Sequence, residues 1–145
     1  MRFTTKTEYG LVCLAYMARK AADEVTAVKE IAEREQFPQP YIQQIFHALC
    51  EANIVHAHHG RLGGYSLSRP ASEITLRQIV EALEGGTFDV FCEPDVRKEI
   101  TCTHFSLCGV KPVWQKTKDI LDQFYGSITL DMMAKNRFNF DAVKL

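Results

Sequence analysis

The sequence predicts a mainly α-helical chain: a winged helix-turn-helix with a small β-hairpin wing, followed by a long C-terminal dimerisation helix. Three observations lead to this fold class. Apolar residues recur at helical spacing in successive stretches before residue 53, and two short β-prone runs then flank a glycine cluster. A wide apolar face at heptad-like spacing begins after Pro112. The 145 residues, 46% of them hydrophobic, suffice for one domain with a core and an added dimerisation element.

The first half of the chain shows the order of helices that a helix-turn-helix requires. The first helix is expected over residues 4–20, and Thr26 is expected to cap a short second helix with the sequence VKEIAEREQ. Pro38 and Pro40 then interrupt the pattern, and Pro40 suits the first position of a third helix that runs to about Ala52. A short helix, a tight connection and a third helix form a helix-turn-helix candidate.

The segment after the third helix predicts the wing and a fourth helix. In IVHAHHGRLGGYSLSRP, two β-prone runs flank Gly60, Gly63 and Gly64, which is typical of a hairpin. Thr75 and Gln78 have the spacing of a capping box, so the helix LRQIVEALEG is expected to begin there and to end at the following glycine pair.

The C-terminal part predicts a dimerisation helix. The stretch VWQKTKDILDQFYGSITLDMMAK places apolar residues from Val113 to Ile128 along one face. Such a face most simply pairs with its copy in a homodimer, and the alternative is that it packs on its own domain. The expected organisation is a winged helix-turn-helix region at 1–86, a cysteine-rich loop at 87–110, a dimerisation helix region at 111–135 and a tail at 136–145.

The five cysteines are of two kinds. Cys13 and Cys50 lie on apolar helical stretches, where a cysteine usually acts as a small core residue. Cys92, Cys102 and Cys108 lie instead in an acidic loop with gaps of nine and five residues. Thiolates are soft ligands suited to iron–sulfur clusters, zinc or copper, so the loop indicates a metal-based sensor. A cluster needs four ligands, so another residue must contribute.

Composition narrows the class of protein. A net charge of −1 indicates a localised nucleic-acid contact patch rather than a coat of positive charge. No signal-peptide pattern and no apolar run long enough to span a bilayer is found, so we expect a cytoplasmic protein with no membrane partner. No Ser-His-Asp, Walker or Rossmann pattern appears, so an enzyme is not expected.

The residues expected to contact double-stranded DNA lie on the third helix, on the wing and near the N-terminus. On the third helix, Tyr41, Gln43 and Gln44 are expected on the exposed side, where glutamine can bind adenine through two hydrogen bonds in the major groove. At the wing, Arg61 would enter a minor groove or meet a phosphate, and His59 would add charge when protonated. Arg2 and Lys29 would hold the duplex through phosphates. For each of these, an ordinary solvated side chain is the alternative.

Read in order, the motifs resemble the Rrf-two family of bacterial transcriptional regulators. They are MRFTTKTEYGL, VKEIAERE, PYIQQIF, GRLGGYSLSRP, ITLRQIVEALEG, the three loop cysteines and SITLDM, and they cover roughly residues 1–133. The resemblance implies a homodimeric winged helix-turn-helix that binds a pseudo-palindromic operator. It also implies an iron–sulfur cluster (2Fe-2S or 4Fe-4S) that tunes DNA binding, with Cys92, Cys102 and Cys108 as its thiolate ligands.

The fourth ligand follows from the same resemblance. Some relatives use a histidine three residues after the last cysteine, but Lys111 stands there in this chain. Others use an acidic residue at the eighth position of the partner subunit, which here is Glu8, and a glutamate that merely favours the start of a helix is the alternative. His104 is a weaker candidate.

The chain departs from the family pattern in two places. The gap of nine residues between Cys92 and Cys102 is longer than in several relatives, which leaves the number of irons open. In the wing, the usual Arg-Gly-Pro-Gly-Gly-Gly-Tyr becomes His-Gly-Arg-Leu-Gly-Gly-Tyr, so Arg61 takes the place of the proline.

The functional hypothesis is a dimeric repressor gated by a cluster that senses iron, redox state or nitric oxide. Two other readings stay open. One is a regulator that depends on thiols or zinc and has no cluster, and the other is a winged helix that binds only proteins.

Overall fold

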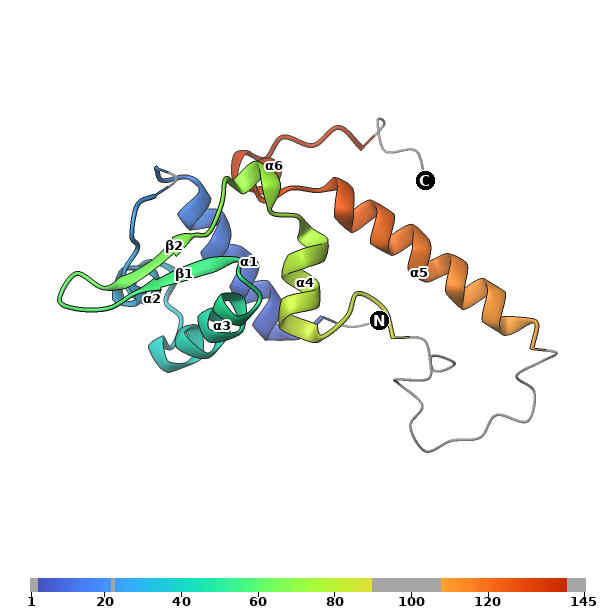
Figure 1. Cartoon of the computed structure of the whole chain (residues 1–145), viewed down its shortest axis with the longest axis horizontal. Coiled ribbons are helices and arrows are strands. Elements are labelled where there is room, and N and C mark those ends of the chain that lie inside the picture. Colours follow the sequence, from blue (N-terminus) through green and yellow to red (C-terminus); the bar gives the residue numbers. More distant parts are fainter. Residues whose placement is uncertain (1–2, 22, 90–107, 141–145) are drawn as a thin grey trace.

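The computed structural model describes residues 3–21, 23–89 and 108–140, and Figure 1 shows the order of their helices and strands. The elements are α1 (Thr5–Ala18), α2 (Val28–Glu35), α3 (Gln39–Glu51), β1 (Val55–His58), β2 (Gly64–Leu67), the 3-10 turn η1 (Ala71–Glu73), α4 (Leu76–Glu84), α5 (Val110–Ser127) and α6 (Leu130–Lys135). This arrangement confirms the predicted fold class of a mainly helical winged helix-turn-helix.

The core lies where α1, α3 and α4 pack together, and α2 and the hairpin both contact α3. The largest fully buried side chains come from several elements, so no single helix could be stable alone. They include Leu14, Ile31, Ile42, Ile45, Phe46, Leu49, Ile54, Ile74, Ile79 and Leu130. Burial of this apolar surface is the main stabilising contribution to the fold.

The wing is a two-stranded antiparallel hairpin whose register runs from Val55 opposite Leu67 to His58 opposite Gly64. The second strand is attached near its start to the segment before α2, because Thr26 and Tyr65 exchange backbone hydrogen bonds of 2.8 and 2.9 Å. The Tyr65 ring also stacks on Phe46 of α3, with 4.5 Å between ring centroids. The hairpin is therefore fixed relative to α3.

The predicted helix cap at Thr26 is wrong. The N-cap of α2 is Ala27, and the Thr26 hydroxyl is buried without a hydrogen-bond partner among the described residues. Pairing with Tyr65 holds Thr26 in an extended bridge, so tertiary contact overrides the local capping preference.

Both prolines lie within a first helical turn, Pro40 at the second position of α3 and Pro112 at the third position of α5. Amides there have no partner inside the helix, which is why proline fits.

The capping box of α4 is confirmed. The Thr75 hydroxyl accepts a hydrogen bond from the Gln78 amide at 3.3 Å, and the Gln78 side chain accepts one from the Thr75 amide at 2.9 Å. Gly85 ends the helix with φ of +87°, a conformation that glycine adopts without strain.

The predicted continuous C-terminal helix is wrong, because the chain is extended at Ile128 between α5 and α6. Two Ile-Thr-Leu triplets, residues 74–76 and 128–130, pair antiparallel at this point. The Leu76 amide donates to the Ile128 carbonyl and the Leu130 amide to the Ile74 carbonyl, both at 2.8 Å. Thr129 then caps α6 by accepting from the Met132 amide, just as Thr75 caps α4. We call these residues the paired triplets.

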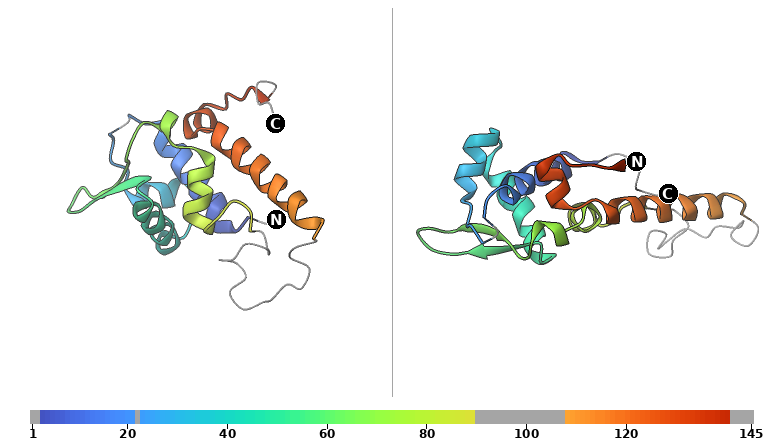
Figure 2. Two further views of the ribbon diagram at one scale, coloured as in Figure 1. Left: turned by 45° about the vertical axis from the view of Figure 1, so that its right-hand side comes forward. Right: turned by 90° about the horizontal axis from the view of Figure 1, so that it is seen from above.

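Helix α5 extends away from the body formed by α1 to α4, as both views in Figure 2 show. It contacts α4, and Tyr125 near its C-terminal end is buried. Toward its N-terminus, Val110, Val113 and Trp114 are 52%, 57% and 43% exposed. Within the described ranges, no helix combines the length and the apolar character that crossing a bilayer requires.

Candidate nucleic-acid interface and metal-ligand residues

Helix α3 presents Gln43 and Gln44 to solvent, as the apolar periodicity predicts. The opposite side of the helix is buried through Ile42, Ile45, Phe46 and Leu49. Tyr41 is only half-buried and does not lie fully on the exposed side, because its ring packs edge-on against Tyr9 with 5.6 Å between centroids. The two glutamines are thus the side chains of this group that are free to meet a base edge.

A polar groove of about 400 Å³ lies between the start of α2, the start of α3 and the wing. We call it the wing groove. Three of the predicted DNA contacts line it, namely Lys29, His59 and Arg61, although they come from separate parts of the sequence. All three are exposed, and no Asp or Glu is among the described residues that line the groove. A groove with this charge suits a phosphate backbone.

Sequence reasoning missed two residues of the wing groove, Gln39 and His58. Gln39 is at the first position of α3, and His58 ends β1 with its Nε2 atom 2.8 Å from the Ser66 hydroxyl oxygen. The signal for His58 was the two-residue period of the strand, but its position opposite α2 depends on the pairing of Thr26 with Tyr65.

The wing ends in a tight turn in which the Gly63 amide donates to the Gly60 carbonyl at 3.0 Å. Gly60 has φ of +105°, and Arg61 and Leu62 are the two central residues of the turn. Gly64 lies directly against the Thr26 carbonyl, where an added Cβ would be 2.2 Å from the oxygen. The wing tip is therefore held by backbone packing and not only by the hairpin bonds.

The predicted metal ligands are described in part. Glu8 is exposed in the first turn of α1, and Cys108 is half-buried directly before Gly109, the N-cap of α5. Cys92, Cys102 and His104, like Arg2 at the N-terminus, lie outside the described residues. Within the described part of the chain no three His, Cys, Asp or Glu side chains come together as a metal site. The chemistry of the donor set, three thiolates and a carboxylate, fits an iron–sulfur cluster with one labile ligand.

The first turn of α1, which carries Glu8, is held by a residue of α4. The Glu84 carboxylate accepts hydrogen bonds from the Thr4 amide at 3.0 Å and from the Thr4 and Thr7 hydroxyls at 2.7 and 2.5 Å. Glu84 thus satisfies the first turn of α1, which has no cap from its own sequence. Burial raises the pKa of Glu84, but the hydrogen bonds from Thr7 and Thr4 and the charge of Lys6 outweigh it and hold that pKa below its ordinary value.

We expect Glu84→Gln to make the stability of the protein less dependent on acid pH. Because the folded-state pKa of Glu84 is depressed, its stabilisation is complete above the ordinary value of 4.5 and is lost as the pH falls through the folded-state value. The substitution should cost roughly 1 kcal/mol of unfolding free energy at neutral pH and less in acid. Urea unfolding at several pH values measures this, with Glu73→Gln on the exposed η1 turn as control. A difference that stays constant with pH would contradict the prediction.

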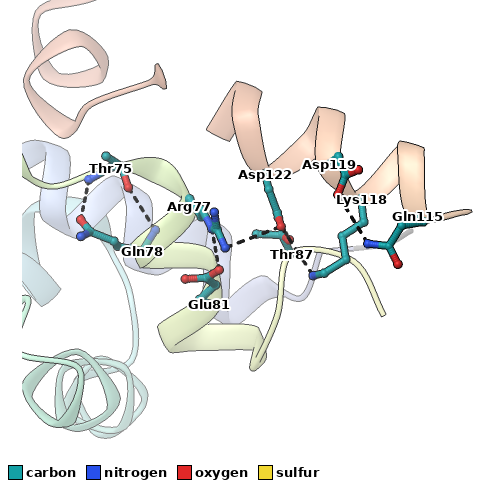
Figure 3. Close-up of polar contacts among 9 residues, drawn as sticks. All are labelled: Thr75, Arg77, Gln78, Glu81, Thr87, Gln115, Lys118, Asp119 and Asp122. Carbon is teal, nitrogen blue, oxygen red and sulfur yellow. Dashed lines mark hydrogen bonds and ion pairs between the residues drawn. The ribbon is translucent and has the colours of Figure 1, made fainter. Parts of the chain in front are cut away.

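A polar network joins α4, the segment after it and α5 (Figure 3). Asp122 of α5 accepts a short hydrogen bond from the buried Thr87 hydroxyl and lies 3.6 Å from an Arg77 guanidinium nitrogen and 3.7 Å from Lys118 Nζ. Arg77 is in turn 2.7 Å from Glu81. The i,i+4 spacing of Lys118 and Asp122 is visible in the sequence, whereas Thr87, 35 residues away, gave no signal.

The two remaining cysteines are core residues, as predicted. Cys13 is fully buried, and burial together with the nearby charge of Glu35 raises the pKa of its thiol to about 12. Cys50 is half-buried, and burial raises its pKa as well. Burial therefore disfavours, for both thiols, the thiolate form that a metal ligand needs.

Comparison with known proteins places this arrangement in a family. Residues 3–136 match the family described as "Rrf2: Iron-dependent Transcriptional regulator". The fold is similar to CymR (YrzC), described as the global cysteine regulator of B. subtilis, with a TM-score of 0.75, 26% identity and coverage of 95% of this chain and 99% of that one. It is similar to the oxidised form of Staphylococcus aureus CymR, with a TM-score of 0.71, 27% identity and coverage of 96% and 100%. It is also similar to T. potens IscR, with a TM-score of 0.68, 26% identity and coverage of 100% and 93%.

The matched region takes in every helix and both strands described above, and the likeness to CymR and IscR covers 95% and 100% of this chain. The chain therefore belongs to the Rrf-two (Rrf2) family of transcriptional regulators.

Proposed function

We propose that this protein is a dimeric repressor whose binding to a pseudo-palindromic operator is gated by an iron–sulfur cluster. Three thiolates, from Cys92, Cys102 and Cys108, would hold the cluster together with Glu8 of the partner subunit. Such a cluster supplies a centre that reacts to iron supply, redox state or nitric oxide. The cytoplasm is the compartment in which these signals and the DNA meet.

The observation that carries the DNA-binding part is the wing groove beside the exposed glutamines of α3. Lys29, His59 and Arg61 surround the groove, and Gln43 and Gln44 lie on the helix that begins at its edge. In a winged helix-turn-helix, cations that grip phosphates fix the register of the duplex, and amide side chains on the third helix then read base edges. The wing groove lies at the start of α3, and the two glutamines follow on the same helix, which suits this division of roles.

The homodimer is proposed from α5. Its N-terminal half exposes Val110, Val113 and Trp114, whereas its C-terminal end is anchored to the body by Tyr125 and the paired triplets. The alternative is that this apolar face packs against its own domain. The exposure of Val110, Val113 and Trp114 in the single chain does not favour that alternative. A two-fold pair of α5 helices would bury the face and set the distance between the two α3 helices, which defines the spacing of the half-sites.

The network around Asp122 offers a route from the cysteines to the DNA. Thr87 precedes the cysteine region, Asp122 lies on the proposed dimer helix and Arg77 lies on α4, which packs against α3. Glu8 shares α1 with the Glu84 contact to α4. A change at the cysteine ligands would therefore alter how α4 and α5 sit together, and hence the half-site spacing, without altering a base contact.

A second candidate is a thiol- or zinc-dependent regulator without a cluster. The likeness to Staphylococcus aureus CymR favours it, because that protein is known in an oxidised form. The same cysteines would then form a regulatory disulfide or a zinc site.

Anaerobic purification of the full-length chain tests the proposal. We expect a brown protein with iron and sulfide in equal amounts, whose affinity for a duplex enriched from a random-sequence pool changes when the metal is removed. Colourless protein with stoichiometric zinc, or binding that responds to oxidants but not to iron, would replace the cluster by the second candidate. Failure to enrich any duplex would contradict DNA binding itself.

A further inference from the structure

Leu62 is the most exposed large hydrophobic residue among those described, at 90% exposure. The other exposed large apolar side chains of the described regions lie between 37% and 57% and are on helices or near the termini. Leu62 is alone at the tip of the wing, beside Arg61 in the same two-residue turn. Single exposed apolar side chains are common on protein surfaces, so what distinguishes Leu62 is its place at the tip of the wing, next to the predicted DNA contact Arg61.

The wing tip is built to hold these two side chains in place. The hydrogen bond from Gly63 to Gly60 closes the turn, and Gly63 and Gly64 pack against backbone oxygens that leave no room for a side chain. Tyr65 then attaches the hairpin to Thr26 and, through its ring, to α3. Arg61 and Leu62 therefore keep a fixed position relative to the exposed glutamines, so both would reach the same duplex at a defined distance from them.

The residues around Leu62 indicate which kind of partner its side chain would contact. The wing groove next to it carries Lys29, His59 and Arg61, so a surface that meets the tip is a polyanion. On its other side Leu62 borders a shallow groove with Val25, Ala27 and Glu30. The minor groove of DNA is polyanionic and also offers apolar surface, because sugar rings form its walls and base edges its floor. It therefore suits a leucine that lies beside an arginine.

We propose that Leu62 is a specificity-determining residue that enters the minor groove beneath the wing and favours operators with an easily deformed step there. This inference rests on the proposed DNA binding. Apolar side chains that enter the minor groove partly unstack a base step, and pyrimidine–purine steps yield most readily. Arg61 would hold the groove through its negative potential, while Leu62 would gain from leaving water.

The test compares Leu62→Gln with Leu62→Met in the full-length protein, in the metal state that binds DNA. Glutamine and methionine both extend one atom further than leucine and match each other in length, but only methionine keeps the apolar character. We expect Leu62→Gln to lower affinity for the enriched duplex about tenfold and Leu62→Met to stay within roughly threefold of the wild type. Both variants should unfold at the wild-type temperature, since the side chain packs on little of the fold.

Repeating the duplex enrichment separates the possible causes. Leu62→Gln should keep the bases read by α3 and lose the preference for a pyrimidine–purine step under the wing. An adenine analogue, 2-aminopurine, at that step should brighten with the wild type and not with Leu62→Gln. Equal affinity and an unchanged base preference in Leu62→Gln would overturn the role of Leu62 alone. A wild-type protein that enriches no duplex would overturn the proposed function, and this inference with it.

Discussion

Cys102→Ala is expected to yield a colourless protein whose DNA affinity equals that of the metal-free wild type. In the proposed cluster each thiolate would bind iron directly, and loss of even an outer partner of a metal ligand costs about 10- to 100-fold in metal affinity. Bound iron should therefore fall by at least roughly that factor. The visible spectrum, iron and sulfide assays and a binding titration on the enriched duplex measure the two parts of the result.

Cys50→Ala is the matched control for this experiment. It removes a thiol from the same chain, but from a half-buried position where burial raises the pKa and no ligand role is expected. The colour and the iron content should be unchanged. If Cys102→Ala lost its colour but bound DNA as the loaded wild type does, the cluster would be structural and the gating would be contradicted.

Gly64→Ala is expected to destabilise the fold by roughly 2–4 kcal/mol and to remove DNA binding. The added methyl carbon would lie 2.2 Å from the Thr26 carbonyl oxygen and 2.7 Å from its carbon, both backbone atoms that cannot rotate away. Relief requires the wing to separate from the segment before α2, which breaks both hydrogen bonds between Thr26 and Tyr65. Urea unfolding and a binding titration report the two effects.

Gly126→Ala tests whether the effect is specific to that contact. Gly126 lies near the end of α5 with no atom within 4 Å of an added Cβ, so alanine should be neutral or should stabilise the helix by about 0.5–1 kcal/mol. Should Gly64→Ala unfold at the same urea concentration as the wild type, the close packing of the wing on Thr26 would be refuted.

The local sequence signals predicted the structure correctly where residues close together in the sequence determine it. Thr75 and Gln78 are three residues apart, and their capping box formed as the sequence indicates. Thr26 is also a threonine before a helical stretch, yet it pairs with Tyr65 instead of capping α2. The difference is the contact between Thr26 and Tyr65, which are 39 positions apart in the sequence. No local sequence pattern reports a contact over that distance.

The break at Ile128 was missed for a related reason. Ile128 is buried, so it continues the apolar periodicity of α5 even though its backbone is extended. A helix-start signal was nevertheless present, because Thr129 precedes Leu130 and Asp131 in the way that a cap precedes a first turn. The repetition of Ile-Thr-Leu at residues 74–76 would have strengthened it.

The candidate DNA contacts were predicted to different degrees. The exposure of Gln43 and Gln44 followed from the helical period of α3, and that part is confirmed. The wing groove depends on the meeting of α2 with the hairpin, so the sequence could name Lys29 and Arg61 but could not place them together. The roles of the cysteines and of Glu8 stay predictions.

The paired triplets join the two ends of residues 76–128 at one point, although α4 within this segment packs in the core. The Leu76 amide and the Ile128 carbonyl are joined by a single hydrogen bond, and Thr87 with Asp122 closes a second, inner ring. The entropy of closing such a ring grows with the logarithm of its length, so doubling the number of residues costs only about 0.6 kcal/mol. A change in the spacing between Cys92 and Cys102 would therefore cost little free energy and would leave the contact between the paired triplets in place.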